Sequence, residues 1–262
     1  MDQSKPTFTI DLNQFIAQLQ QDLMTDLTAL RVVLKSIKDN DYPNIKIYSP
    51  DNSFQNWAIN PLPEPEVLRV RQITDCFKAV MGSLHDCIDK LVATIRLCEL
   101  TRNENVFVAD KPLTLEGVQE FISKKFLEIL ENISRDQSLK VPEKLEILSI
   151  DDDLKQILQN YFGIRNGFEH HKGISNKDRV TTFKKMSFVA DSGKEIREII
   201  GPGVLNAGEG ISVRFVDEEI SFKEGDVMNL NYSQIENVIF TIVIYMAPKL
   251  IDAVTKKTNV IN

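Results

Sequence analysis

Residues 151–173 read DDDLKQILQNYFGIRNGFEHHKG and combine a helical apolar pattern with a concentration of acid-base and anion-binding groups. Its apolar side chains recur three and four residues apart, which predicts an amphipathic helix. They are Leu154, Ile157, Leu158, Tyr161 and Phe162. The three aspartates at 151–153 lie where the positive end of the helix dipole would be, and Gly173 marks the expected end. The last turns carry two of the three histidines of the chain beside an arginine and an asparagine.

The polar groups of this helix fall mainly on one arc. With Arg165 at zero and about 100° per residue, Asn166 lies at roughly 100° and His170 at roughly 140°. Glu169 lies on the same arc, at roughly 40°, whereas His171 falls off it at roughly 240°. Arg165 with Glu169, and Asn166 with His170, are neighbours four residues apart and can pair locally. We therefore predict Arg165, Asn166 and His170 as catalytic residues, with Glu169 and His171 as possible supporting residues.

These residue types suit phosphoryl chemistry. Histidine is the side chain whose ordinary pKa falls near neutral pH, and a guanidinium is a forked donor for phosphate oxygens. Arg165, Asn166, three further residues and His170 resemble the signature of the HEPN superfamily, the helical domains of prokaryotic ribonucleases and nucleotide-binding partners. In that family, Arg precedes a polar residue, often Asn, and His follows after four to six intervening residues. The resemblance covers at most residues 6–175 plus the last helix.

The resemblance implies a metal-independent endoribonuclease that acts as a homodimer, with motif helices from two subunits lining one cleft. His170 would be the acid-base group, Arg165 would stabilise phosphate charge, and Asn166 would orient the site or hydrogen-bond a phosphate oxygen. The expected products carry 2′,3′-cyclic phosphate and 5′-hydroxyl ends. No cofactor and no metal are expected. RNA is the expected substrate, a toxin or defence role and a regulatory antitoxin protein are possible, and the expected location is the cytoplasm.

Two other interpretations stay open. Arg165 can simply pair with Glu169, and histidines near a helix C-terminus are favoured by the dipole without any catalytic duty. The chain would then be a non-catalytic HEPN-type scaffold that binds nucleic acid, nucleotides or protein. A metal hydrolase built on Glu169, His170 and His171 is disfavoured, because adjacent helical side chains point about 100° apart.

Composition and charge narrow the function classes. The chain has 262 residues, 42% of them apolar, which is enough for a substantial core. A net charge of −7 argues against a general nucleic-acid binder. Local cations are still present near the motif, and we predict Lys172, Lys184 and Lys185 as substrate-binding residues; the alternative is that they are solvated surface charges. No secretory signal and no membrane span are expected, and the apolar run 238–247 is interpreted as a buried core helix.

Most of the chain reads as helix. Amphipathic spacing predicts helices over 12–37, 66–100 and 112–135, and with the motif helix these make a four-helix bundle. A proline-rich segment, 39–65, separates the first two as a long loop, and a linker is expected around Pro142. The three cysteines are eleven residues apart, on one stripe of the second helix, so we interpret them as core residues and not as metal ligands. His85 on this helix is expected to be packed or satisfied by a partner.

After residue 175 the pattern changes from helical spacing to alternation. Strands are expected over 180–184, 211–215 and 220–222, with a hairpin turn at 217–219 and glycine-punctuated loops at 201–203 and 208–210. A closing helix over 233–256 is apolar on most faces and should return to the bundle. The predicted fold is therefore mainly α, an HEPN-like helical bundle with a small antiparallel β module inserted before the last helix. Its expected parts are residues 1–175, 176–231 and 232–262.

Overall fold

The computed structural model describes most of the chain, and the remaining residues are not discussed. The described residues are 10–39, 64–103, 114–136, 138–191, 195–196 and 210–261. Almost all of the loop expected over 39–65 lies outside these ranges, as does the glycine segment 201–203 and most of 208–210.

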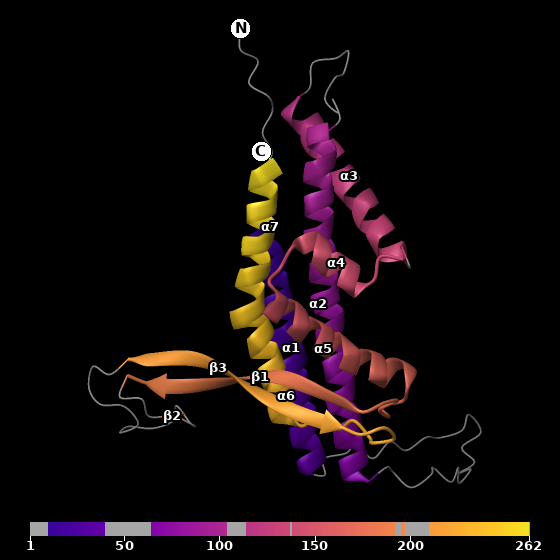
Figure 1. Ribbon diagram of the computed structural model, residues 1–262, viewed down its shortest axis with the longest axis vertical. Helices are drawn as coiled ribbons and strands as arrows, with labels where there is room; N and C mark the ends of the chain where they lie inside the picture. Colours follow the sequence, from indigo (N-terminus) through magenta and orange to yellow (C-terminus); the bar gives the residue numbers. More distant parts are fainter. Residues whose placement is uncertain are drawn as a thin grey trace, which may run out of the picture.

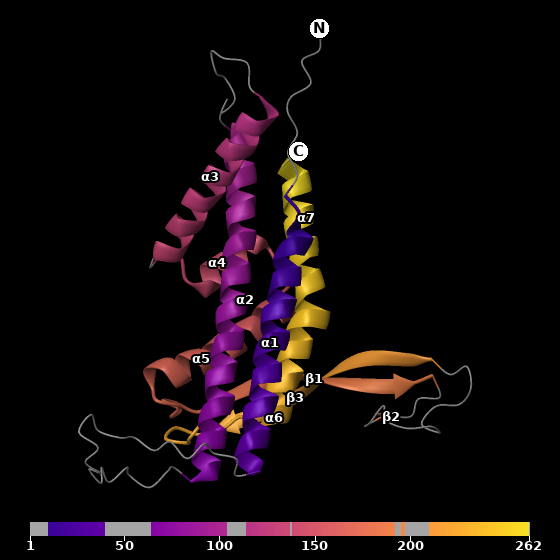
Figure 2. The ribbon, with the colours of Figure 1, turned by 180° about the vertical axis from the view of Figure 1, so that it is seen from behind.

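Three long helical segments form the body of the molecule (Figure 1). α1 spans Leu12–Lys38 and α2 spans Pro65–Asn103, which confirms the first two predicted helices. The third segment is built from α6 (Tyr232–Phe240), one π-helical turn, η1 (Thr241–Met246), and α7 (Ala247–Ile261). α1 runs antiparallel to the other two segments (Figures 1 and 2). The predicted closing helix therefore does return to the bundle.

Much of the apolar run of the closing helix is buried, as expected, although Ile244 is 43% exposed. Val238, Ile239, Ile242, Met246 and Ala247 are completely buried in the main hydrophobic core. Within the described ranges, the stretch Tyr232–Thr258 is long and apolar enough to cross a membrane, with a mean hydropathy of 1.7 in its most apolar window. A core helix of a soluble protein passes the same test, and 44% of this window is buried inside the fold. The stretch is therefore weak evidence for a membrane span.

Three further helices pack around α2. α3 spans Leu115–Arg135 and begins where expected, because the Thr114 hydroxyl accepts a hydrogen bond from the Gly117 amide. α4 spans Val141–Leu148, so the expected linker around Pro142 is wrong: proline is tolerated in the first turn of a helix, and this one buries Leu145 and Leu148. α5 spans Asp152–His170 and is the predicted motif helix.

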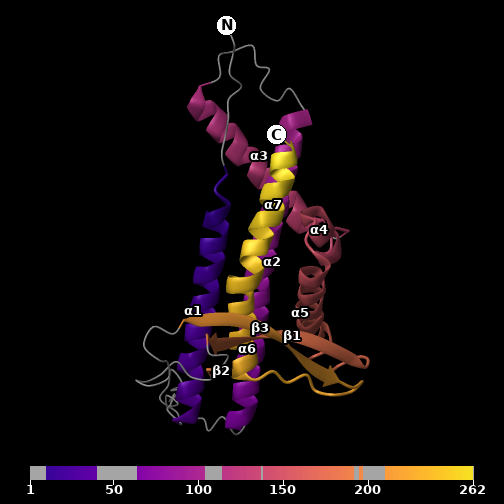
Figure 3. The same cartoon turned by 60° about the vertical axis from the view of Figure 1, so that its left-hand side comes forward.

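The four-helix arrangement expected for the bundle also needs correction. The motif helix α5 lies obliquely across α2, and the closing segment α6–α7 takes its place beside α1 and α2 (Figures 1 and 3). α3 packs on α2 through a separate small cluster of Leu97, Val118 and Ile122. The overall class is nevertheless the predicted one, mainly α with a small antiparallel sheet inserted before the last helix.

The sheet is a long twisted ribbon. β1 (Arg179–Ala190) and β3 (Ile211–Phe222) pair antiparallel without interruption, from Arg179 opposite Phe222 to Ala190 opposite Ile211. The short β2 (Glu195–Ile196) pairs with the end of β1, which gives the order β2-β1-β3. The predicted turn at 217–219 is wrong, because these acidic residues lie inside β3. The two strands expected on either side of that turn form one strand.

Candidate functional site

Local interactions fix both ends of the motif helix α5. The Asp151 carboxylate accepts a hydrogen bond from the Leu154 amide at 2.7 Å, as expected of a helix N-cap. At the other end, the Gly173 amide donates to the Gly167 carbonyl at 3.1 Å, and Gly173 has φ +77°, which favours glycine. Phe168 packs edge-on against Phe77 of α2, with ring centroids 5.8 Å apart. The last turns of α5 are therefore held firmly against the central helix.

Arg165 and Glu169 form an ion pair within α5. Arg165 Nε donates to Glu169 Oε1 at 3.0 Å, and the two side chains are 24% and 33% exposed. This is the local pairing that the four-residue spacing indicates. It uses one of the five N–H donors of the guanidinium, so the others stay available for a second acceptor.

Asn166 and His170 are exposed at the same end of the helix. In the described part of the chain, neither has a hydrogen bond or ion pair from its side chain, and the expected pairing between them does not form. His171, off the arc, lies with Nε2 3.3 Å from the side-chain nitrogen of Asn176. The structure therefore leaves Asn166 and His170 accessible, whereas Arg165 already has a partner.

The three predicted substrate lysines do not gather at the motif. Lys172 follows the helix in a left-handed conformation, with φ 54°, and is exposed. Lys184 is only 13% exposed and its ammonium lies 2.9 Å from Asp217 and 3.5 Å from Asp153. Lys185 is exposed and follows Lys184 directly in β1, so the two side chains point to opposite faces of the ribbon. Of these three lysines, Lys172 and Lys185 are exposed and have no ion pair within the described residues, whereas Lys184 has two.

A buried charged cluster that sequence reasoning did not identify lies where α2, α4 and α5 meet. Lys144 Nζ is 2.6 Å from Asp89 Oδ1, and these side chains are 3% and 4% exposed. The same ammonium is 3.1 Å from His85 Nε2. The imidazole also packs edge-on against Phe162 of α5, with ring centroids 5.9 Å apart. His85 is thus satisfied by partners, as predicted, but its partners are charged.

This cluster is electrostatically coupled to the motif. Burial lowers the pKa of His85 below its ordinary value, and the positive charges of Lys144 and Arg165 lower it further, against the opposing effect of Asp89. A neutral imidazole next to Arg165 avoids repulsion between two cations at this end of α5. The spacing of His85 and Asp89 on one helix was visible in the sequence, but no local signal brings Lys144 or Arg165 to them.

The β ribbon is anchored to the motif helix. Arg179, the first residue of β1, donates from Nη1 to the Gly163 carbonyl at 2.7 Å. Met228, after β3, covers Gly167 so closely that an added Cβ there would lie 2.1 Å from its terminal methyl carbon. The inserted ribbon thus stabilises the position of α5.

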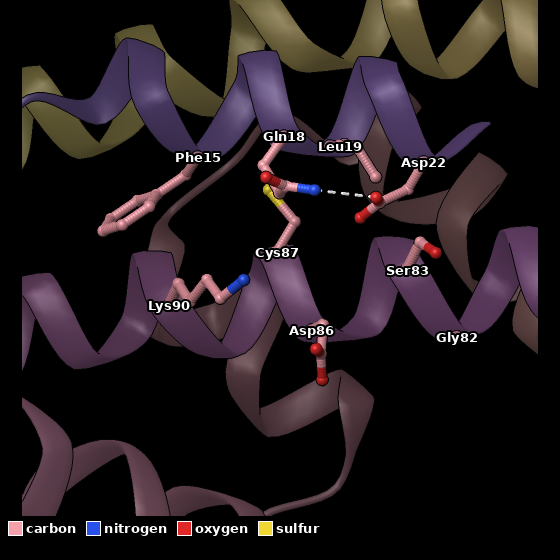
Figure 4. Close-up of a pocket in the computed structure, with 9 residues that line it drawn as sticks. All are labelled: Phe15, Gln18, Leu19, Asp22, Gly82, Ser83, Asp86, Cys87 and Lys90. Atoms are coloured by element: carbon pink, nitrogen blue, oxygen red, sulfur yellow. Dashed lines mark hydrogen bonds between the residues drawn. The ribbon is translucent and has the colours of Figure 1, made fainter. Parts of the chain in front are cut away.

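Two surface cavities lie away from the motif. One, of about 270 Å³, opens between α1 and α2, where Gln18 donates to Asp22 at 2.8 Å and Lys90 lies across from Phe15 (Figure 4). The other, of about 550 Å³, lies between the end of α1, the start of α2 and Tyr232. No residue of α5 lines either cavity.

The described residues contain no cluster of three or more histidine, cysteine or acidic side chains that would hold a metal ion. The three cysteines are unpaired, and burial raises the pKa of Cys76 and of Cys87 to about 12. Cys76 and Cys87 are core residues, as the sequence indicated, and such thiols are poor nucleophiles. Cys98 is only partly buried and lies outside the described core clusters, so the core prediction holds for two of the three.

No family model, no curated protein and no solved structure matches this chain. By its structure, the chain is a mainly helical protein with an inserted antiparallel ribbon and a polar motif at the end of α5.

Proposed function

We propose that this protein is a metal-independent endoribonuclease that acts as a homodimer. The observation that supports this best is the position of Arg165, Asn166 and His170 together at one end of α5, with Asn166 and His170 exposed. An acid-base group, an amide and a guanidinium on one accessible surface are the groups that RNA cleavage without a metal needs.

The proposed reaction uses the internal nucleophile of RNA. His170 removes the proton from a 2′-hydroxyl, and the oxygen attacks the adjacent phosphorus. The bond from phosphorus to the 5′-oxygen breaks, and the same histidine of a second copy protonates that oxygen. The products are a 2′,3′-cyclic phosphate and a 5′-hydroxyl. Arg165 stabilises charge on the phosphorane through the guanidinium donors that Glu169 does not occupy, and Asn166 donates to a phosphate oxygen.

The test compares the parent protein with R165A, N166A and H170A on end-labelled RNA in EDTA. The matched control is H171A, which removes the adjacent exposed imidazole that lies off the arc. Each exchange should lower the cleavage rate by about 100-fold or more, the usual contribution of an acid-base or oxyanion group, and H171A should have little effect. Circular dichroism checks that all variants fold. Equal cleavage by parent and variants would rule out this site.

A second candidate function is a non-catalytic scaffold that binds nucleic acid, nucleotides or protein. The ion pair between Arg165 and Glu169 favours it, because it satisfies the guanidinium within the chain. RNA binding that depends on Arg165, without any cleavage product, would support this candidate. A toxin or defence role, an antitoxin partner and a cytoplasmic location are expectations that come with the family resemblance.

A further inference from the structure

One edge of β3 is unpaired in the described part of the chain. The sheet order β2-β1-β3 gives β3 a partner on one side only, and this strand is twelve residues long. About half of its backbone N–H and C=O groups therefore point away from β1, toward the open edge. Figures 1 and 2 show that the ribbon extends away from the helices, so no helix covers its outer part.

The side chains of β3 protect its edge only in part, because its charges are confined to Arg214 and the acids 217–219. Proteins usually block exposed edges with lysine, proline, a bulge or a short strand. β3 contains neither lysine nor proline, and its pairing with β1 has no bulge. Ile211, Val213 and Val216 are 39%, 43% and 48% exposed. A long, regular, partly apolar edge of this kind is suited to pairing with another strand.

The ribbon is held rigidly near its middle. Thr241 of η1 donates to the Lys184 carbonyl at 3.0 Å, and Phe215 packs against Tyr245 with ring centroids 5.3 Å apart. Lys184 in turn pairs with Asp217 across the two strands at 2.9 Å. A preordered strand loses little conformational freedom when a partner binds.

We propose that β3 pairs antiparallel with β3 of a second copy, about a twofold axis at Val216. This register places Val216 opposite its own copy and Arg214 opposite Glu218. The symmetry forms that opposite-charge pair twice, and cross-strand pairs of opposite charge stabilise a sheet. The four strands β1-β3-β3-β1 then make one continuous sheet across the two copies.

Charge complementarity selects this register over its neighbours. Rotation about a twofold axis perpendicular to the sheet maps each face of the sheet onto itself. A residue can therefore only oppose a residue whose side chain lies on the same face. An axis at Phe215 instead would place Arg214 opposite Val216, without an ion pair. An axis at Asp217 would place two aspartates opposite each other, which is unfavourable. The register at Val216 is the arrangement in which Arg214 meets an acid.

This surface differs from the exposed end of α5, and the proposal does not depend on ribonuclease activity. The mass of the protein in solution tests it, measured by sedimentation over a concentration series. R214E and E218R each replace two ion pairs by two like-charge pairs, and each should raise the dissociation constant of the β3 contact about tenfold or more. The double variant R214E/E218R restores opposite charges and should restore the assembly. K177E, a charge reversal at an exposed lysine before β1, is the matched control.

A crosslinking experiment tests the register. V216C places two thiols opposite each other across the twofold axis, at a spacing that suits a disulfide. Mild oxidation should give a covalent dimer with V216C and not with V213C, whose two copies lie far apart. A parent protein that is monomeric throughout, single reversals that leave the mass unchanged, or equal crosslinking of the two variants would each overturn the proposal.

Discussion

Lys144 of α4 lies 2.6 Å from Asp89 of α2, and both side chains are almost completely buried. Taking two charges out of water is costly, and their mutual attraction offsets that cost only while both are present. The pair therefore ties α4, the short helix that precedes the motif helix, to one place on the central helix. It also sets the charge environment of His85, whose ring nitrogen is 3.1 Å from the ammonium.

Removing one member of this pair should be strongly destabilising. K144M leaves the Asp89 carboxylate buried without its partner, and the free energy of unfolding should fall by about 3–5 kcal/mol. The double variant K144M/D89L removes both charges and should lose less than K144M alone. Urea denaturation measures both. K155M, which breaks the more exposed pair with Glu146, is the control and should lose no more than about 1 kcal/mol. Equal losses for K144M and K155M would contradict the role of burial.

The lowered pKa of His85 predicts how stability depends on pH. Because burial favours the neutral imidazole in the folded state, the unfolded chain binds a proton at a higher pH than the folded chain. Above its ordinary pKa of 6.5, His85 therefore does not reduce the free energy of unfolding. As the pH falls below that value, stability is lost. The parent should lose stability between neutral and mildly acidic pH, and H85Q should lose less. An identical pH slope in the two proteins would show that His85 is not responsible.

Local patterns predicted most of the helices, but they did not predict α4 or how the helices assemble. The spacing of apolar residues, together with the acids at 151–153 near the start of α5, was sufficient for α3 and α5, since those signals act within one helix. The acids at 217–219 favoured a turn by composition alone. In the structure, Asp217 is extended because it pairs with Lys184 on the neighbouring strand, a contact that no local pattern contains.

In the candidate site too, contacts within one helix were predictable from the sequence, whereas contacts between elements were not. The pairing of Arg165 with Glu169 followed from their four-residue spacing. The contact of Lys144 with His85, and the effect of Arg165 on the pKa of His85, involve three helices, and no local pattern in the sequence indicates either. Lys184 was expected to bind substrate because it is a cation near the motif. Its two carboxylate partners come from α5 and β3 and became visible only in the fold.

Freeing Arg165 from Glu169 should strengthen RNA binding if the motif contacts phosphate. E169Q removes a partner that competes with phosphate and a negative charge beside the proposed site. The affinity for labelled single-stranded RNA should rise several-fold at low salt, as measured by fluorescence anisotropy. E146Q removes the same charge from a surface pair on α4 and is the control. The pair of Arg165 and Glu169 is partly exposed, so E169Q should change the free energy of unfolding by less than about 1 kcal/mol. Equal effects of E169Q and E146Q would indicate a general charge effect.

Gly167 lies directly against the end of the Met228 side chain. A Cβ at Gly167 would lie 2.1 Å from the terminal methyl carbon of Met228, and both residues are buried. G167A should therefore lower the free energy of unfolding by about 1–3 kcal/mol, even though alanine is the better helix former. Thermal or urea unfolding measures the change.

Gly82 provides a matched control within α2. An added Cβ there meets nothing within 4 Å, so G82A should stabilise the protein by about 0.5–1 kcal/mol through helix propensity alone. G167A should lower the free energy of unfolding and G82A should raise it. Comparing the two therefore separates the effect of crowding from that of helix propensity. If crowding by Met228 is the cause, G167A should cost less in an M228A background than in the parent, because the shorter side chain leaves space for the new methyl group. Equal costs in both backgrounds would show that Met228 is not the constraint.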